Sequence, residues 1–177
     1  MKKILLTILL VFIVTFSYSQ IWNNTRHTDL YKPILLNFEV GYEYGVGMDS
    51  ISRTVTDFSV IITPNNVFGF GAGTGLRYYY EKEIVLLPVY IEIRGYPFTY
   101  RKSWLPYISV KLGHTFNLTE GFNPEGFMTT PSVGMMYETR NNKFYSISIN
   151  YSIQSIKQPT PPNENWNAIG LNFGYSF

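Results

Sequence analysis

Side chains able to act as a catalytic base are scarce in this chain. Among the 177 residues there are two histidines, His27 and His114, and no cysteine. A histidine activates a hydroxyl nucleophile only when the two groups lie within hydrogen-bond reach. His114 alternates with Phe116 on an apolar face that carries no nearby serine, and His27 precedes the first periodic segment. The sequence therefore predicts no catalytic residues.

A metal or cofactor site has no better support. Structural and catalytic zinc sites combine several His, Cys or carboxylate ligands, whereas His27 and His114 are far apart in the sequence. The carboxylates of Glu39 and Glu43 are explained more simply by pairing with basic side chains. We expect neither a metal nor a cofactor.

Four glycines stand at strict spacing two, at Gly69, Gly71, Gly73 and Gly75. A phosphate-binding loop requires G-x-G-x-x-G between a strand and a helix. The spacing here is different and no helical pattern follows. These glycines are predicted to leave room for bulky side chains on a neighbouring strand, such as Tyr90 or Arg94.

Apolar residues recur at every second position through most of the chain, which is the signature of β-strands. In the clearest segment, Phe38, Val40 and Tyr42 share one face while Glu39 and Gly41 lie on the other. Most segments reach the ~9 to 11 residues that a tilted strand needs to cross a bilayer. We therefore predict an all-β fold, an eight-stranded antiparallel up-and-down transmembrane β-barrel. The predicted strands are 36–46, 52–63, 68–78, 87–94, 108–116, 127–139, 145–154 and 166–177.

The polar strand faces are mostly Gly, Ser, Asn and Thr, with six ions among them. An Arg or Lys facing lipid near mid-bilayer would cost ~2 to 4 kcal/mol, whereas inside the barrel the ions can neutralise one another. An eight-stranded barrel is just wide enough for side chains to fill, so we expect a plugged interior and no open pore. The alternative is that the ions lie on solvated strand ends and never meet. The predicted interior ion network is Glu39, Glu43, Arg77, Glu92, Arg94 and Lys111.

An even number of strands places both chain ends on the periplasmic side, where turns are usually short, while outside loops are longer. Short periplasmic turns are predicted at 63–66 and 140–143, and long outside loops at 119–126 and 157–165. Aromatic residues cluster near the predicted strand ends, where they would form girdles at the two membrane interfaces. Their alternative role is ordinary barrel packing. The aromatic set is Trp22, Trp104, Trp166, Tyr78, Tyr79, Tyr80, Tyr96, Phe98 and Tyr107.

The first nineteen residues have the pattern of a cleaved secretory signal peptide, with Lys2 and Lys3 followed by the apolar stretch 4–16 and small residues before a cut after Ser19. Residues 20–177 then form one barrel domain. Removing Lys2 and Lys3 leaves 14 − 2 = 12 basic residues against 12 acidic ones. A formally neutral chain gives no electrostatic support for a nucleic-acid partner.

The final segment alternates Phe173, Tyr175 and Phe177 with small or polar residues. Together with segments 87–94, 105–113 and 170–177, this pattern resembles the small outer-membrane β-barrels of the OmpX and OmpA-barrel type, and especially the β-barrel proteins of Bacteroidetes. The resemblance implies a monomeric protein of the bacterial outer membrane. Its partners would be membrane lipid and lipopolysaccharide, and the barrel-assembly machinery would read Phe173, Tyr175 and Phe177 as a C-terminal assembly signal.

Three functions fit such a barrel. The leading hypothesis is a non-enzymatic protein that contributes to envelope integrity or surface interaction. A lipid-A-modifying enzyme is the second, since outer-membrane deacylases and palmitoyltransferases are barrels that use a His with a hydroxyl nucleophile. The third is a small-solute channel or a hydrophobic-ligand-binding barrel, although aqueous pores usually need ~16 to 18 strands.

Overall fold

The computed structural model describes residues 34–47, 51–64, 67–97, 104–119, 121–139, 143–156 and 164–177. The predicted signal peptide, His27, Trp22 and Phe98 lie outside these ranges. No helix within them is long and apolar enough to span a bilayer. The strands all belong to one compact unit, Lys32–Phe177.

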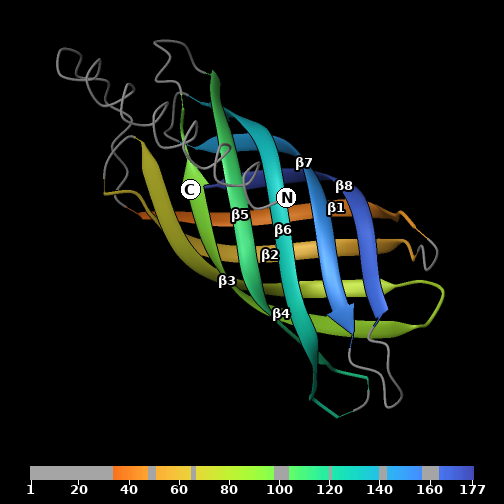
Figure 1. Cartoon of the computed structure of the whole chain (residues 1–177). Helices are drawn as coiled ribbons and strands as arrows, with labels where there is room; N and C mark the ends of the chain where they lie inside the picture. The colour runs from red at the N-terminus through yellow and green to blue at the C-terminus, as the bar shows by residue number, and fades with distance from the viewer. Residues whose placement is uncertain are drawn as a thin grey trace, which may run out of the picture. The chain divides into compact units, whose positions relative to one another are not determined.

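Eight antiparallel strands close into a barrel in chain order (Figure 1). Each strand pairs with its sequence neighbours, and β8 pairs with β1 to complete the ring. The predicted eight-stranded antiparallel barrel is therefore confirmed, and the strand predicted at 52–63 is present as β2. The strands are β1 (Ile34–Gly45), β2 (Arg53–Ile62), β3 (Phe68–Tyr79), β4 (Ile84–Gly95), β5 (Trp104–Asn117), β6 (Asn123–Glu138), β7 (Phe144–Ile156) and β8 (Glu164–Ser176).

The seam between the first and last strands is closed by backbone hydrogen bonds. The register runs from Asn37 opposite Ser176 to Gly45 opposite Ala168. Beyond β8, Leu36 and Phe177 exchange both N–H···O bonds at 3.0 Å. A closed ring leaves no unpaired strand edge, which is the condition for a β-structure to lie in lipid.

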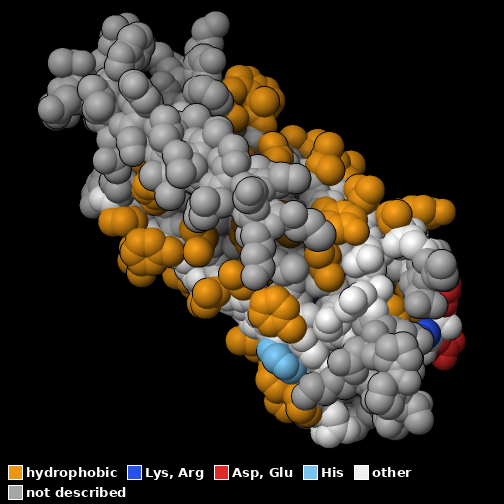
Figure 2. Space-filling view, in the orientation of Figure 1, with side chains coloured by type: hydrophobic (Ala, Val, Ile, Leu, Met, Phe, Trp, Pro, Cys, Tyr) orange, Lys and Arg blue, Asp and Glu red, His pale blue; other side chains and the backbone are white. Residues whose placement is uncertain are grey.

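The period-two pattern separates an apolar outside from a polar inside. Along β7, the outward residues Tyr145, Ile147 and Ile149 are exposed, while Ser146 and Ser148 between them are buried. The other strands follow the same rule, and Figure 2 shows apolar side chains spread over the visible barrel wall, with the visible charges gathered at one end. The outer surface is thus suited to lipid and the interior to polar contacts.

The two loops predicted to be long are shorter than expected. β6 begins at Asn123, so β5 and β6 are joined by residues 118–122, not 119–126. The pairing of β5 with β6 extends into the predicted loop, because a β-bulge after Thr115 shifts the register and lets Phe116 pair with Pro124. The connection between β7 and β8 likewise ends at 163, because β8 starts at Glu164.

Aromatic residues do gather on the outer surface near both ends of the barrel. At the end that holds the start of β1, the rings of Trp104 and Tyr137 lie 4.9 Å apart, and those of Tyr145 and Tyr175 lie 5.4 Å apart. At the other end, Tyr80 contacts the rings of Tyr42 and Tyr78 on the outward face. These positions suit membrane interfaces.

Part of the predicted girdle is wrong, because four of its members point inward. Trp166, Tyr79, Tyr96 and Tyr107 are all buried. Each has the parity of the polar face of its strand, as Trp166 has that of Gly170. An aromatic residue near a strand end thus faces the side that the alternation assigns to it.

Trp166 and Tyr79 belong to an apolar cluster inside one end of the barrel. Their rings lie 5.0 Å apart, and Lys82 places its Nζ 4.2 Å from the centre of the Trp166 ring. This end cluster consists of Ile51, Tyr79, Leu86, Ile156 and Trp166. It covers the end of the interior that holds the β3–β4 and β7–β8 connections.

Candidate functional site in the barrel interior

Alternation brings charged side chains from five consecutive strands, β1 to β5, into the interior. All six members of the predicted network are buried there, with exposed fractions of 3% or less. Two further ions, Arg53 and Asp57 on β2, join them. The described interior therefore holds four acidic and four basic side chains, and it is formally neutral.

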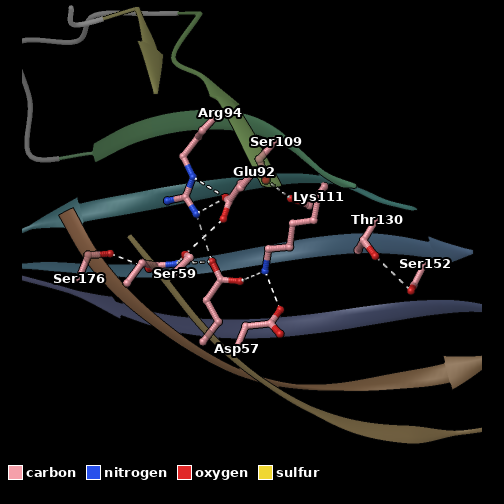
Figure 3. Close-up of polar contacts among 12 residues, drawn as sticks. Asp57, Ser59, Glu92, Arg94, Ser109, Lys111, Thr130, Ser152 and Ser176 are labelled. Carbon is pink, nitrogen blue, oxygen red and sulfur yellow. Dashed lines mark hydrogen bonds and ion pairs between the residues drawn. The ribbon is translucent and has the colours of Figure 1, made fainter. Parts of the chain in front are cut away.

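Lys111 on β5 forms the centre of the network (Figure 3). Its Nζ donates to Oε2 of Glu39 at 2.6 Å and to Oδ2 of Asp57 at 2.8 Å. Glu39 and Asp57 are directly opposite each other on β1 and β2. The ammonium group of Lys111 thus offsets the repulsion between two neighbouring carboxylates.

Arg94 on β4 binds two carboxylates, those of Glu92 and Glu39. Its Nη2 lies 2.6 Å from Oε1 of Glu92 and 3.2 Å from Oε1 of Glu39, and its Nε also donates to Glu92. The guanidinium carbon lies 4.5 Å from the centre of the Tyr107 ring, within cation–π range. Glu39 is consequently shared between Lys111 and Arg94.

Two more arginines hold the acids of β1 and β2. Arg77 on β3 donates its Nη1 to Oδ1 of Asp57 at 2.6 Å and its Nη2 to Oδ2 at 2.9 Å. Such a two-pronged contact is the strongest geometry for an Arg–carboxylate pair. Arg53 donates its Nε to Glu43 at 2.5 Å and its Nη1 to the hydroxyl of Tyr79 at 2.6 Å.

Neutral side chains extend the network to the barrel seam. Asn37 donates its Nδ2 to Oε1 of Glu39 at 2.9 Å, and Ser176 donates its hydroxyl to Oδ1 of Asn37 at 2.7 Å. Ser59 donates to Glu92 at 3.3 Å. Hydrogen bonds of this kind are what make a buried charge tolerable.

Glycines make room for the large inward side chains. A Cβ added at Gly73 would lie 2.7 Å from the Tyr90 hydroxyl oxygen, and one at Gly134 would lie 2.6 Å from Cζ of Tyr107. Gly113 faces Tyr90 as well. Within the glycine run on β3, Gly73 alone accommodates Tyr90, whereas a Cβ at Gly69, Gly71 or Gly75 would meet atoms of 56–63, and none of the four would meet Arg94 within the three nearest atoms. The run lies inside a strand and forms no phosphate loop.

The predicted network does not include Arg53 and Asp57, because the prediction for this segment rests on its apolar face alone. The signal was present, since Asp57 stands between Thr56 and Phe58 and therefore points to the opposite side from them. The alternation does not show which acidic side chain binds which basic one. Lys111 is opposite Glu92 in the β4–β5 register, yet its ammonium group binds Glu39 and Asp57.

The histidine within the described residues stands apart from this network. His114 is on the outward face of β5, with its ring 5.8 Å from that of Phe116. Its Nδ1 lies 3.3 Å from the carbonyl oxygen of Thr115. In the described ranges, no group of three His, Cys, Asp or Glu side chains is placed to hold a metal ion.

The residues predicted to form an assembly signal line the outward face of β8. Phe173 and Phe177 are exposed, and Tyr175 packs between the rings of Tyr145 and Phe177. Lys143 lies beside Tyr175, with its Nζ 5.9 Å from the ring centre. Their role in barrel assembly stays a prediction.

This architecture is that of the small β-barrels of bacterial outer membranes, so the expected class of fold is confirmed. Neisserial surface protein A has the same fold with a TM-score of 0.67, at 12% identity over 82% of this chain and 96% of that one. The N-terminal β-barrel domain of Pseudomonas aeruginosa OprF gives a TM-score of 0.53 at 13% identity, covering 82% and 98% of the two chains. The outer-membrane enzyme PagL gives 0.52 at 10% identity, covering 78% and 97%.

These likenesses are to the fold alone. No protein-family model and no curated protein matches the sequence. The neighbours include an enzyme as well as a surface protein, so the shared fold does not fix the activity. The narrower resemblance to the Bacteroidetes barrels stays a prediction.

Proposed function

We propose that this protein is a non-enzymatic outer-membrane β-barrel with a side-chain-filled interior, and that it contributes to envelope integrity or surface interaction. It would be exported with a signal peptide that is cut after Ser19, and it would act as a monomer in contact with membrane lipid and lipopolysaccharide. The fold neighbours support the outer membrane as its location. The role within that membrane is the step that experiments must test.

One observation carries the proposal: charges are concentrated inside the barrel wall, and large apolar side chains are exposed outside it. A soluble barrel needs a charged outer face to stay dissolved. A lipocalin-like barrel would instead line its interior with apolar groups for a hydrophobic ligand. Here the interior centre is occupied by linked ion pairs such as Lys111–Asp57 and Arg94–Glu92.

The first experiment compares boiled and unboiled outer-membrane fractions on a gel. A folded membrane barrel should give a band that shifts with heating, and the protein should fractionate with the outer membrane. A band that stays in the soluble fraction without a shift would overturn the membrane proposal. It would redirect the search to a hydrophobic ligand.

The role in the envelope is tested by deleting the gene and measuring sensitivity to detergents and large antibiotics, together with surface binding. A non-enzymatic envelope role predicts a change in at least one of these properties, and it predicts that lipid A keeps its mass spectrum when the protein is overproduced. A changed lipid A spectrum would establish the enzymatic alternative. Unchanged envelope and binding properties would count against the proposed role.

A plugged interior predicts that the purified barrel gives no stable conductance in planar bilayers. Eight strands leave space for side chains and not for a wide channel. Steady single-channel steps would replace the proposal with a small-solute channel. In that case Lys111→Ala should alter ion selectivity, because Lys111 lies at the centre of the interior.

A further inference from the structure

The pairing of β6 with β7 is interrupted towards the end of the barrel that holds the end cluster. The register runs without a break along β6 from Glu138 to Ser132. After two residues that have no recorded partner on β7, it resumes at Thr129, which is opposite Ile153. Pro131 lies in this gap, and a proline interrupts a ladder because it has no N–H to donate. Unpaired backbone groups are costly in lipid, so the gap is a weak point of the wall.

A second gap, in the seam between β3 and β4, is better compensated. It contains Pro88, and pairing resumes beyond it at Arg77 opposite Leu86. Oγ1 of Thr74 donates to the carbonyl oxygen of Pro88 at 2.8 Å, and the short turn 80–83 then joins the two strands. The other six seams have no missing pair within the described strands, apart from the β-bulge between β5 and β6.

No turn joins β6 to β7 beyond their gap. At this end of the barrel β6 is connected to β5 and β7 to β8, because the connection between β6 and β7, 139–143, lies at the opposite end. The register beyond the gap contains two pairs, Thr129 with Ile153 and Met128 with Gln154. The two strands can therefore separate here without breaking a hairpin.

Two side-chain hydrogen bonds close this part of the seam from the inside. Thr130 and Ser152, which lie in the gap on the two strands, have hydroxyl oxygens 3.2 Å apart (Figure 3). Gln154 on β7 donates its Nε2 to Oγ1 of Thr115 on β5 at 2.5 Å. All four side chains are buried and uncharged. Because the net contribution of a neutral hydrogen bond is small, these contacts hold the seam less firmly than the ion pairs hold the centre of the barrel.

We propose that the part of the β6–β7 seam beyond Pro131 is an opening point in the barrel wall. The two strands separate there as far as Ser132, where the continuous register begins, while β6 stays paired with β5 and β7 with β8. The opening gives the bilayer a lateral route to a neutral polar patch of the interior. This inference rests on the proposed membrane location, which the heat-shift gel tests separately. The patch consists of Thr115, Thr130, Ser152 and Gln154.

Amide hydrogen exchange of the full barrel in lipid nanodiscs tests whether this part of the seam opens. We expect the amides of 151–153 to exchange about tenfold faster in the unmutated protein than in Pro131→Ala, because alanine restores the missing N–H donor. Pro106→Ala is the matched control, since Pro106 on β5 pairs with Met135 in an unbroken register, and it should leave exchange on β7 unchanged. Equal exchange in Pro131→Ala and the unmutated protein would overturn the proposal.

Chemical labelling tests whether the opening reaches the interior from the bilayer. The chain has no cysteine, so one introduced thiol reports access. Ser152→Cys places the thiol at the gap, and Ser148→Cys is its control, buried on the same strand and face but opposite Gly134 in the continuous register. With a maleimide whose alkyl chain partitions into the bilayer, Ser152→Cys should react about tenfold faster than Ser148→Cys. Equal rates for the two thiols would contradict an opening at the gap.

A charged, water-soluble thiol reagent distinguishes entry through the wall from entry through the mouth of the barrel. Each labelling rate is divided by the rate of the same reagent with a free thiol. The lateral route predicts that Ser152→Cys reacts more slowly with the charged reagent than with the alkyl maleimide, and that adding Pro131→Ala slows the alkyl maleimide. Faster reaction with the charged reagent would show entry through the mouth and overturn the lateral route.

Discussion

Lys111 on β5 and Glu39 on β1 are joined across the barrel interior, with Nζ of the first 2.6 Å from Oε2 of the second. Their strands are not neighbours in the sheet. The ion pair therefore connects opposite parts of the wall without any backbone contact. Because both side chains are buried, this contact has consequences for stability that a surface ion pair would lack.

Replacing Lys111 with methionine should destabilise the barrel strongly. The change leaves Glu39 and Asp57 close together with one base fewer, and removing one partner of a buried ion pair costs about 3–5 kcal/mol. Urea unfolding in lipid vesicles measures the difference. Lys143→Met is the control, since Lys143 is exposed, and we expect a change within about 0.5 kcal/mol.

A double-mutant cycle identifies the cause of that loss. If Lys111 acts by compensating Glu39, Glu39→Gln should recover part of the stability lost in Lys111→Met, so the two changes will not add. Strict additivity of the two free energies of unfolding would show that the pair is not coupled. The same cycle with Ser109→Ala in place of Glu39→Gln should be additive, because Ser109 bonds to Ser132 and not to the ions.

Gly134→Ala should destabilise the barrel through a clash with one side chain. A Cβ at this position would lie 2.6 to 2.7 Å from ring and hydroxyl atoms of Tyr107, and such overpacking costs about 1–3 kcal/mol. In a Tyr107→Leu background the clash is removed, so the added cost of Gly134→Ala should fall towards zero. An equal cost in both backgrounds would assign the effect to the backbone instead.

The fold could be predicted from the sequence because the alternation of apolar and polar residues shows how many strands there are and which side of the barrel wall each residue faces. An even number of such strands in chain order can close into a ring. The same rule placed Lys111 and Glu92 inside. It could not assign their partners, since that depends on how far each long side chain reaches across the interior. Glu39, for example, is bound by residues of β4 and β5, 55 and 72 positions along the chain. Trp166 differs from the predicted girdle for another reason: its position along the strand, and not its aromatic type, decides that it points inward.

Arginine substitutions on the outward face of β7 should show which part of the strand lies in the hydrocarbon region of the membrane. Ile149 lies near the middle of β7 and Tyr145 near its end, on the same face, and both are exposed. In a bilayer, arginine costs about 2–4 kcal/mol at the midplane and about 0–1 kcal/mol near the interface. Ile149→Arg should therefore destabilise the vesicle-embedded barrel far more than Tyr145→Arg does. Equal costs at the two positions would mean that β7 does not cross a bilayer.

Phe177 offers a way to separate barrel closure from assembly in the cell. Its backbone bonds to Leu36 at the seam, whereas its side chain is exposed on the outside and contacts Tyr175. Phe177→Ala keeps both backbone bonds, so the purified variant should refold in vesicles with a nearly unchanged free energy of unfolding. If the side chain serves as an assembly signal, the same variant should accumulate less in the outer membrane of cells. Ile169→Ala, an outward change towards the other end of β8, where Ile169 is opposite Tyr44, controls for loss of apolar surface. Equal outer-membrane levels of the two variants, measured by heat-modifiable bands, would remove the signal role from Phe177.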